Sequence, residues 1–207
     1  ESPRLFGEFY QPLGTGSPYF VAPEFQFSRQ DMMLRADNKI TAEYQRVENY
    51  GAMKFGREFG SYGELVGGLR LGHGNLIRHI GDPELPEYGY QIGEAFTHAT
   101  IDTLDNPDFP TDGVLAAVTY SAASTGLGDC ADYNQIMGAV AWPFTWGADT
   151  LTLRNTFGWT SGGNPPPQSG YTLGGFFNLS GFEPNSLYAS SFDIGQLMYY
   201  HRFAKAG

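Results

Sequence analysis

The sequence predicts an all-β protein built from a single antiparallel up-and-down sheet. Apolar and polar residues alternate along much of the chain with the period of two that marks a half-exposed strand. Glycine is abundant, at 28 of 207 residues, and aromatic residues make up 15% of the chain, a composition typical of strands and turns. Helical spacing of apolar residues with capping signals is hard to find.

The alternation is clearest in four windows along the chain. In each window the apolar residues fall on one face of the expected strand, and polar or small residues fall on the other. The apolar faces are Tyr19, Val21, Phe25 and Phe27; Leu65, Leu69 and Leu71; Val114, Ala116, Val118 and Tyr120; and Leu151, Leu153, Phe157 and Trp159. From these windows and the turn signals between them, nine strands are expected, at residues 4–12, 18–29, 40–57, 62–73, 89–104, 113–123, 132–143, 149–161 and 186–203.

The connections between these strands alternate in length. Short turns are expected at 14–17, 58–61, 105–111 and 145–148, and longer loops at 30–39, 74–87, 124–131 and 162–185. In an up-and-down sheet, alternate connections lie at the same end. Tight turns at one end and long loops at the other are typical of outer-membrane barrels.

Composition also favours a membrane barrel. Charged residues are 16% of the chain, against roughly 25% in an average soluble domain, and several expected strands exceed the usual globular length of about 5–6 residues. A closed sheet with an apolar outside satisfies every backbone group in lipid. Two soluble alternatives give the same alternation: a β-sandwich with the apolar face as its core, and a lipocalin-like barrel.

Other partner classes and segments are disfavoured. With 12 Lys and Arg against 22 Asp and Glu, the net charge is −10, which argues against nucleic-acid binding through phosphate neutralisation. No apolar run reaches the roughly 18 residues of a transmembrane helix. The first ten residues do not form a signal peptide, so the chain is expected to be cytoplasmic or to start downstream of the true N-terminus. The single cysteine, Cys130, cannot form an internal disulfide.

Nine strands conflict with the even number found in bacterial single-chain barrels. We therefore expect residues 1–207 to be one outer-membrane β-barrel domain that is incomplete at both ends. The expected open edges also predict that this segment does not fold alone as a closed barrel.

The turn after the fifth expected strand carries a recognisable motif. The stretch "DNPDFPTDG" resembles a periplasmic turn of the bacterial surface antigen superfamily, which includes the barrels of BamA, TamA and the two-partner secretion transporters. The proline fixes φ and ends the strand, Asp or Asn caps the turn, and the glycine permits backbone geometry closed to other residues. The motif residues are Asp105, Asn106, Phe109, Pro110, Thr111 and Gly113.

A second motif lies in the longest expected loop. The stretch "NLSGF" at 178–182 resembles the superfamily's V/I-R-G-F/Y motif, which the resemblance places in a loop folded into the barrel lumen. Gly181 and Phe182 match the motif, Leu179 replaces its β-branched residue, and Ser180 stands where the family has arginine. The acidic partner of that arginine would lie beyond Gly207.

The L-S-G form is similar to the barrel of the patatin-like phospholipases, as are "EFYQPL", "GREFGSYGEL" and "LMYYHRF". This resemblance covers essentially the whole chain, and it makes the nine strands the fourth to twelfth of sixteen. It implies an integral outer-membrane domain that anchors or delivers a lipase located upstream. The alternative within the superfamily is the barrel of an assembly or two-partner secretion factor. The implied partners are the lipid bilayer and either a translocated polypeptide or the chain's own upstream domain.

No catalytic, metal or cofactor site is expected in this segment. A G-x-S-x-G nucleophile motif is absent, and His73, His79, His98 and His201 lack metal-ligand spacing. Asp105, Asp108 and Asp112 lack the EF-hand calcium pattern. The remaining candidates are polar residues on the expected inward face, interpreted as luminal ion pairs or as a lining for a polypeptide: Glu24, Glu64, Arg70 and Arg154.

Overall fold

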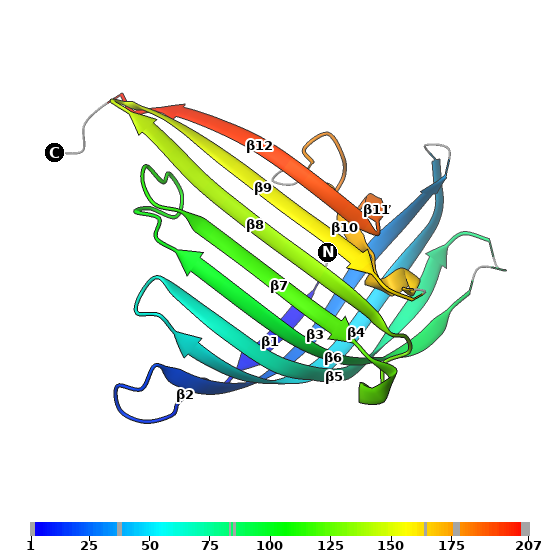
Figure 1. Ribbon diagram of the computed structural model, residues 1–207. Helices are drawn as coiled ribbons and strands as arrows, with labels where there is room; N and C mark the ends of the chain where they lie inside the picture. Colours follow the sequence, from blue (N-terminus) through cyan, green and yellow to red (C-terminus); the bar gives the residue numbers. More distant parts are fainter. Residues whose placement is uncertain are drawn as a thin grey trace.

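The computed structural model describes residues 3–36, 39–82, 84, 86–163, 165–175 and 179–203. Their long strands form one sheet, in which each strand is antiparallel to the next (Figure 1). The sheet strands are β1 (Arg4–Glu8), β2 (Gln11–Pro12), β3 (Tyr19–Ala36), β4 (Lys39–Glu58), β5 (Gly63–Ile80), β6 (Tyr88–Asp102), β7 (Leu115–Ala123), β8 (Tyr133–Trp146), β9 (Asp149–Ser161) and β12 (Ser191–His201).

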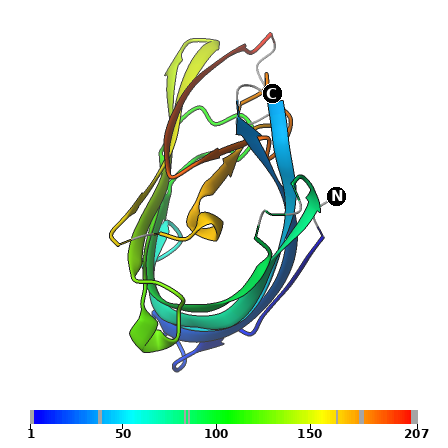
Figure 2. The same cartoon turned by 90° about the vertical axis from the view of Figure 1, so that its right-hand side faces the viewer.

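The sheet curves into an open trough, with β1 at one edge and β12 at the other (Figure 2). A second, two-stranded sheet of β10 (Tyr171–Leu173) and β11 (Leu187–Ala189) lies inside the curve, next to the short helix η2 (Pro167–Ser169). Another short helix, η1 (Thr125–Leu127), follows β7. The all-β up-and-down prediction is confirmed, and the long strands form one continuous sheet rather than a sandwich of two.

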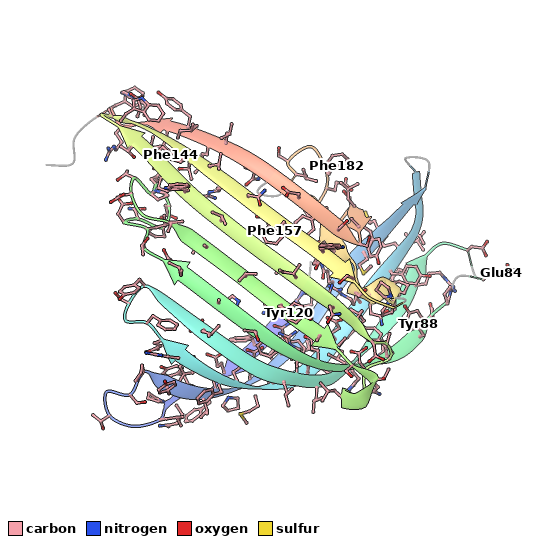
Figure 3. All side chains as sticks on the ribbon, in the orientation of Figure 1. Glu84, Tyr88, Tyr120, Phe144, Phe157 and Phe182 are labelled. Carbon is pink, nitrogen blue, oxygen red and sulfur yellow. The ribbon has the colours of Figure 1, made fainter. Side chains whose placement is uncertain are left out.

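The two faces of the sheet follow the predicted alternation. Leu69 and Leu71 of β5, Leu153 of β9 and Leu197 of β12 lie exposed on the outer, convex face. Register places their polar chain neighbours on the opposite, concave face, where Thr150 and Thr152 are fully buried. Figure 3 shows side chains standing on both sides of the ribbon. We call the concave face the luminal face and the convex face the outer face.

The luminal face is apolar near both ends. One buried cluster lies toward the turn before β3 and comprises Phe20, Ala22, Ala52, Val66 and Phe96. The other lies toward the opposite ends of β3–β6 and comprises Met32, Ala42, Tyr44 and Leu76, with Tyr88 packed against it. Arg46 and Glu48 lie between these two clusters, whereas Lys54 is in register with Ala22 of the first cluster and Glu64 lies beyond Val66.

Two expected long loops were wrong. Residues 30–36 continue β3 and pair with β4, so the connection shrinks to residues 37–38. Strand β5 likewise continues to Ile80. Both faces of these extensions carry polar residues, such as outward Asp31 and Gln45 and luminal Gln30 and Arg46. On the luminal face these polar residues stand beside the apolar Met32 and Leu76, so neither face carries a continuous apolar stripe, and the sequence resembles that of a loop.

Three further expectations need correction. The expected strand 4–12 is interrupted at Phe9 and Tyr10 into β1 and β2, which both pair with β3, so the sheet counts ten strands. The expected strand 186–203 divides into β11 and β12. The strict alternation of short and long connections also fails, because 37–38 is very short and 103–114 is long.

None of the helices among the described residues is long and apolar enough to cross a membrane.

Candidate functional site

The luminal wall carries a band of paired charges. Lys54 Nζ lies 2.7 Å from a carboxylate oxygen of Glu24 and also contacts the carboxylate of Glu8. On the neighbouring strands Arg70 pairs with Glu94, a buried carboxylate. These pairs set opposite charges against one another where the side chains are partly removed from water, which offsets part of the cost of desolvation.

Arg70 is held by more than its carboxylate. Its guanidinium lies over the rings of Tyr50 and Phe96, with 4.7 Å and 4.9 Å to the ring centroids. Its Nε is buried without a hydrogen-bond partner. The two aromatic contacts and one ion pair fix the guanidinium in the middle of the luminal face, where little freedom remains for it to reorient.

The structure brings three of the four luminal candidates together. Glu24, Glu64 and Arg70 line one cavity of about 160 Å³, with Lys54 and His98. Arg154 lies apart on β9, with its Nε buried and unbonded. No described carboxylate forms an ion pair with Arg154. The sequence did not predict the partners Lys54, Glu94 and Glu8. The alternation of side chains along each strand would nevertheless have placed Lys54 on the same face as Glu24.

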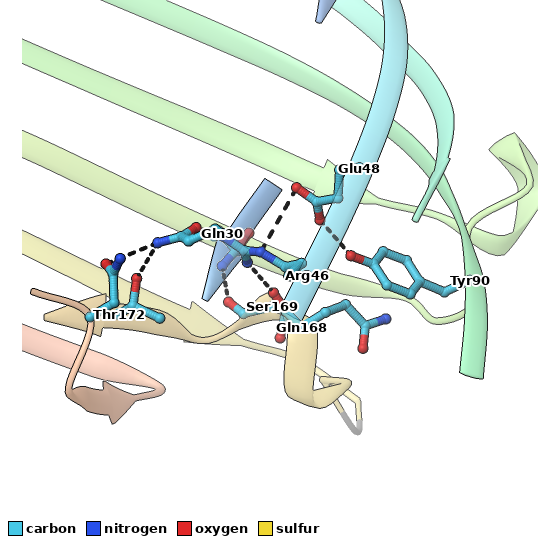
Figure 4. Close-up of polar contacts among 9 residues, drawn as sticks. Gln30, Arg46, Glu48, Tyr90, Gln168, Ser169 and Thr172 are labelled. Atoms are coloured by element: carbon cyan, nitrogen blue, oxygen red, sulfur yellow. Dashed lines mark hydrogen bonds and ion pairs between the residues drawn. The ribbon is translucent and has the colours of Figure 1, made fainter. Parts of the chain in front are cut away.

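The described residues of the range 162–190, here called the inserted loop, cross the luminal face. On one side the loop meets β3, β4 and β6. Arg46 donates to the carbonyl of Gln168 at 2.8 Å, and the Tyr88 hydroxyl donates to the side-chain oxygen of Gln168 at 2.8 Å. Gln30 donates to Thr172 Oγ1 at 2.7 Å. Figure 4 shows the contacts of Arg46 with Gln168 and of Gln30 with Thr172.

The same loop also meets the opposite part of the wall. Gln135 of β8 donates to the carbonyl of Ser169 at 2.6 Å, and the Tyr171 hydroxyl donates to the carbonyl of Ile136 at 3.2 Å. The Tyr171 ring packs edge-on against Phe192 of β12, with 5.1 Å between centroids. The inserted loop therefore bridges strands that are far apart in the sheet.

Arg46 connects the loop to a network in the wall itself. Its second terminal nitrogen donates to Gln30 Oε1 at 2.6 Å, and its Nε lies 3.9 Å from Glu48. The Tyr90 hydroxyl donates to Glu48 at 2.6 Å. This network and the underside of the inserted loop border a cavity of about 490 Å³, also lined by Arg70 and Glu94.

The motif at 179–182 forms the tip of the inserted loop rather than its anchor. The amide of Phe182 donates to the carbonyl of Leu179 at 3.0 Å, which closes a tight turn with Ser180 and Gly181 at its exposed centre. The amide of Gly175 donates to the carbonyl of Phe182 at 2.9 Å. Asn178 lies outside the described residues. The sequence offered no periodic signal for the true anchors, Gln168 to Thr172.

The turn motif forms a compact loop, residues 103–114, here called the turn segment. Asp105 accepts hydrogen bonds from the Thr111 amide at 2.7 Å, the Thr111 hydroxyl at 2.5 Å and the Asp112 amide at 3.1 Å. Asn106 accepts from the amides of Asp108 and Phe109 at 2.9 and 3.0 Å. The Thr111 hydroxyl bond, together with the amides, holds the pKa of Asp105 below its ordinary value.

The turn segment folds against strands that are not its sequence neighbours. Pro110 is fully buried, and its carbonyl accepts a hydrogen bond from the hydroxyl of Tyr200 on β12. Thr145 of β8 donates to the carbonyl of Thr111 at 2.6 Å. The Phe109 ring meets the Tyr200 ring edge-on, with 5.6 Å between centroids. The turn between β6 and β7 thus braces β8 and β12.

No described group of three or more His, Cys, Asp or Glu side chains is placed to hold a metal ion. Arg46, Lys54, Arg70 and Gln135 are instead engaged in the ion pairs and loop contacts above. The arrangement can hold the inserted loop or, if the loop leaves, present paired charges and aromatic rings to another polar chain.

Comparison with known proteins identifies the family. The model of the Omp85 superfamily domain matches residues 7–198. No curated protein matches the chain significantly. Among solved structures, BamA from Haemophilus ducreyi lacking POTRA domains 1–3 is similar with a TM-score of 0.73 and 16% identity. The match covers 90% of this chain and 38% of the BamA chain, and at this identity it shows a shared fold.

Proposed function

The chain belongs to the Omp85 superfamily, and we propose that it forms part of the wall of an integral outer-membrane barrel that anchors or passes a polypeptide. The observation that carries the proposal is the distribution of exposure. Met53, Leu69 and Leu197 on the outer face are 59%, 47% and 69% exposed, while the Glu24–Lys54 and Arg70–Glu94 pairs lie on the luminal face. Apolar area gains about 25 cal/mol per Å² when it leaves water, so this outer face is stable in lipid.

The inserted loop suggests how such a barrel is kept shut. The loop occupies the lumen and is held by polar contacts to β4, β6 and β8, with one ring contact between Tyr171 and Phe192. Polar contacts in a wet lumen exchange with water at little net cost. We therefore propose that the loop is a displaceable occupant, and that the Glu24–Lys54 and Arg70–Glu94 pairs keep the wall in shape when it moves.

For the whole protein, we propose the C-terminal barrel of a patatin-like phospholipase. The support is the resemblance of the L-S-G loop tip and of the strand end at Tyr199, Tyr200 and His201 to that group. In this proposal hydrolysis belongs to an upstream domain, and the present segment is not itself an enzyme. A second candidate is the barrel of an assembly or secretion factor, which the likeness to the BamA barrel favours.

Two measurements on the full-length protein test these proposals. Cell fractionation with electrophoresis of heated and unheated samples should place the protein in the outer-membrane fraction with heat-dependent migration. A protein that stays soluble without detergent and migrates identically in both samples would contradict the membrane proposal.

The second measurement is esterase activity. Activity that is lost on replacing the serine of an upstream G-x-S-x-G motif would support the phospholipase proposal, and an upstream region made only of repeated periplasmic modules would contradict it.

A further inference from the structure

Arg57 is an unpaired cation on the outer face of the sheet. It lies near the end of β4, in register with Tyr19 of β3 and Leu65 of β5, and its side chain is exposed. None of the ion pairs among the described residues includes Arg57. An exposed charge among apolar and aromatic neighbours calls for a specific partner.

Aromatic rings hold this guanidinium in place. It lies 5.0 Å from the ring centroid of Phe59 and 5.6 Å from that of Tyr19. The Tyr19 ring in turn stacks on Phe55, with 6.0 Å between centroids. The rings engage the flat faces of the guanidinium through cation–π contact. Its planar N–H edge is left available, and that edge matches two oxygens of a phosphate group.

The position along the strand suits a lipid headgroup. Exposed aromatic residues gather at this end of the sheet, including Phe59 and Tyr62 in the connection to β5, while Leu65 and Leu69 begin the apolar band above them. Such aromatic girdles mark the headgroup level of membrane barrels. The neighbouring carboxylate of Glu58 accepts a hydrogen bond from Tyr10 at 2.7 Å, and strand parity places it on the luminal face.

We infer that Arg57, with Tyr19 and Phe59, forms a binding site for the phosphodiester headgroup of a membrane phospholipid. The guanidinium edge binds the phosphate, and the flanking rings and Leu65 contact the glycerol and the first acyl carbons. This inference rests on the proposed membrane placement of the outer face. It goes further by assigning one headgroup site to one side-chain cluster.

The test uses the full-length protein in detergent, titrated with phosphatidylglycerol and followed by native mass spectrometry. Arg57→Gln should weaken the tightest bound lipid by about tenfold or more, because a charge-assisted hydrogen bond is lost. Arg57→Lys should retain part of the affinity, because the positive charge remains while the two parallel N–H donors of the guanidinium are lost. Phe59→Leu should weaken binding roughly two- to fivefold. Arg29→Gln, on the outer face of β3, is the matched control and should bind as wild type.

Two results would overturn the site: equal lipid binding by the Arg57→Gln variant and the wild type, or displacement of the lipid by equimolar inorganic phosphate, which would indicate a general anion site. Heat-dependent migration of every variant checks folding. The same assay separates the two proposals. A wild-type protein without heat-dependent migration would contradict the membrane placement. An Arg57→Gln variant that is heat-modifiable and binds lipid as wild type would contradict only the headgroup site.

Discussion

The hydroxyl of Tyr200 on the last strand donates a hydrogen bond to the carbonyl of Pro110 in the turn between β6 and β7. This contact joins residues from opposite parts of the sheet. The Phe109 ring packs on the same tyrosine. The turn motif therefore does more than reverse the chain, because it ties the end of β12 to the middle of the wall.

Replacing Tyr200 tests this brace. Tyr200→Phe keeps the ring contact with Phe109 and removes the hydrogen bond to the buried proline, and it should lower the free energy of unfolding by about 1 kcal/mol. Urea unfolding of the full-length protein in detergent measures this change. Tyr199→Phe is the matched control, since Tyr199 bonds the exposed Asp149 on the outer face; an equal loss in both variants would contradict a specific brace.

Gly113 should tolerate no side chain. Its φ is +91°, and a Cβ there would overlap the carbonyl of Thr103. Gly113→Ala should therefore destabilise the protein by about 2 kcal/mol or more. Gly195→Ala in β12 provides the comparison, because a Cβ at Gly195 meets no atom within 4 Å. Similar urea midpoints for the two variants would show that the turn segment relaxes freely.

The turn segment should lose stability in acid through Asp105. Hydrogen bonds from Thr111 and Asp112 lower the pKa of this carboxyl below its ordinary 3.8. A lowered folded-state pKa gives stability that is present above the unfolded-state pKa and is lost as pH falls through the folded-state pKa. The stability difference between wild type and Asp105→Asn should thus be constant near neutral pH and shrink below about pH 4. A difference that grows on acidification would contradict this assignment.

Arg46 should control how firmly the inserted loop is held. It donates to Gln168 in the loop and to Gln30 in the wall. Arg46→Met removes both bonds, and the amides of residues 168–173 should exchange hydrogen roughly tenfold faster in the full-length protein. Arg29→Met, on the outer face, should leave that exchange unchanged. Unaltered exchange in the Arg46 variant would mean that other contacts hold the loop.

The sequence was sufficient to predict the two faces of the sheet, because the period of two is a local property of each strand. Leu151 lies on the outer face and Thr152 on the luminal face, because consecutive side chains of a strand point to opposite sides of the sheet. The extensions of β3 and β5 could not be told from loops, because polar residues interrupt both of their faces and only isolated apolar residues such as Met32 and Leu76 are buried there.

The inserted loop and the brace depend on contacts between distant segments. Gln168 and Ser169 follow a run of prolines with no periodic pattern, so nothing local shows that they are buried. The turn motif indicated a rigid turn through Pro110 and Gly113, but its packing on Tyr200 requires the curvature of the whole sheet. Resemblance to a family pointed to the right loops without giving their contacts.

The central claim is that the outer face meets lipid and the luminal face meets water. Spin labels at Leu153 and Thr156 of β9 test it directly, because register places Leu153 on the outer face and Thr156 lines the large luminal cavity. In the full-length protein in bilayers, the label at 153 should be accessible to oxygen and shielded from a water-soluble nickel complex, and the label at 156 should show the reverse. A label at 153 that is fully accessible to the nickel complex would contradict the account.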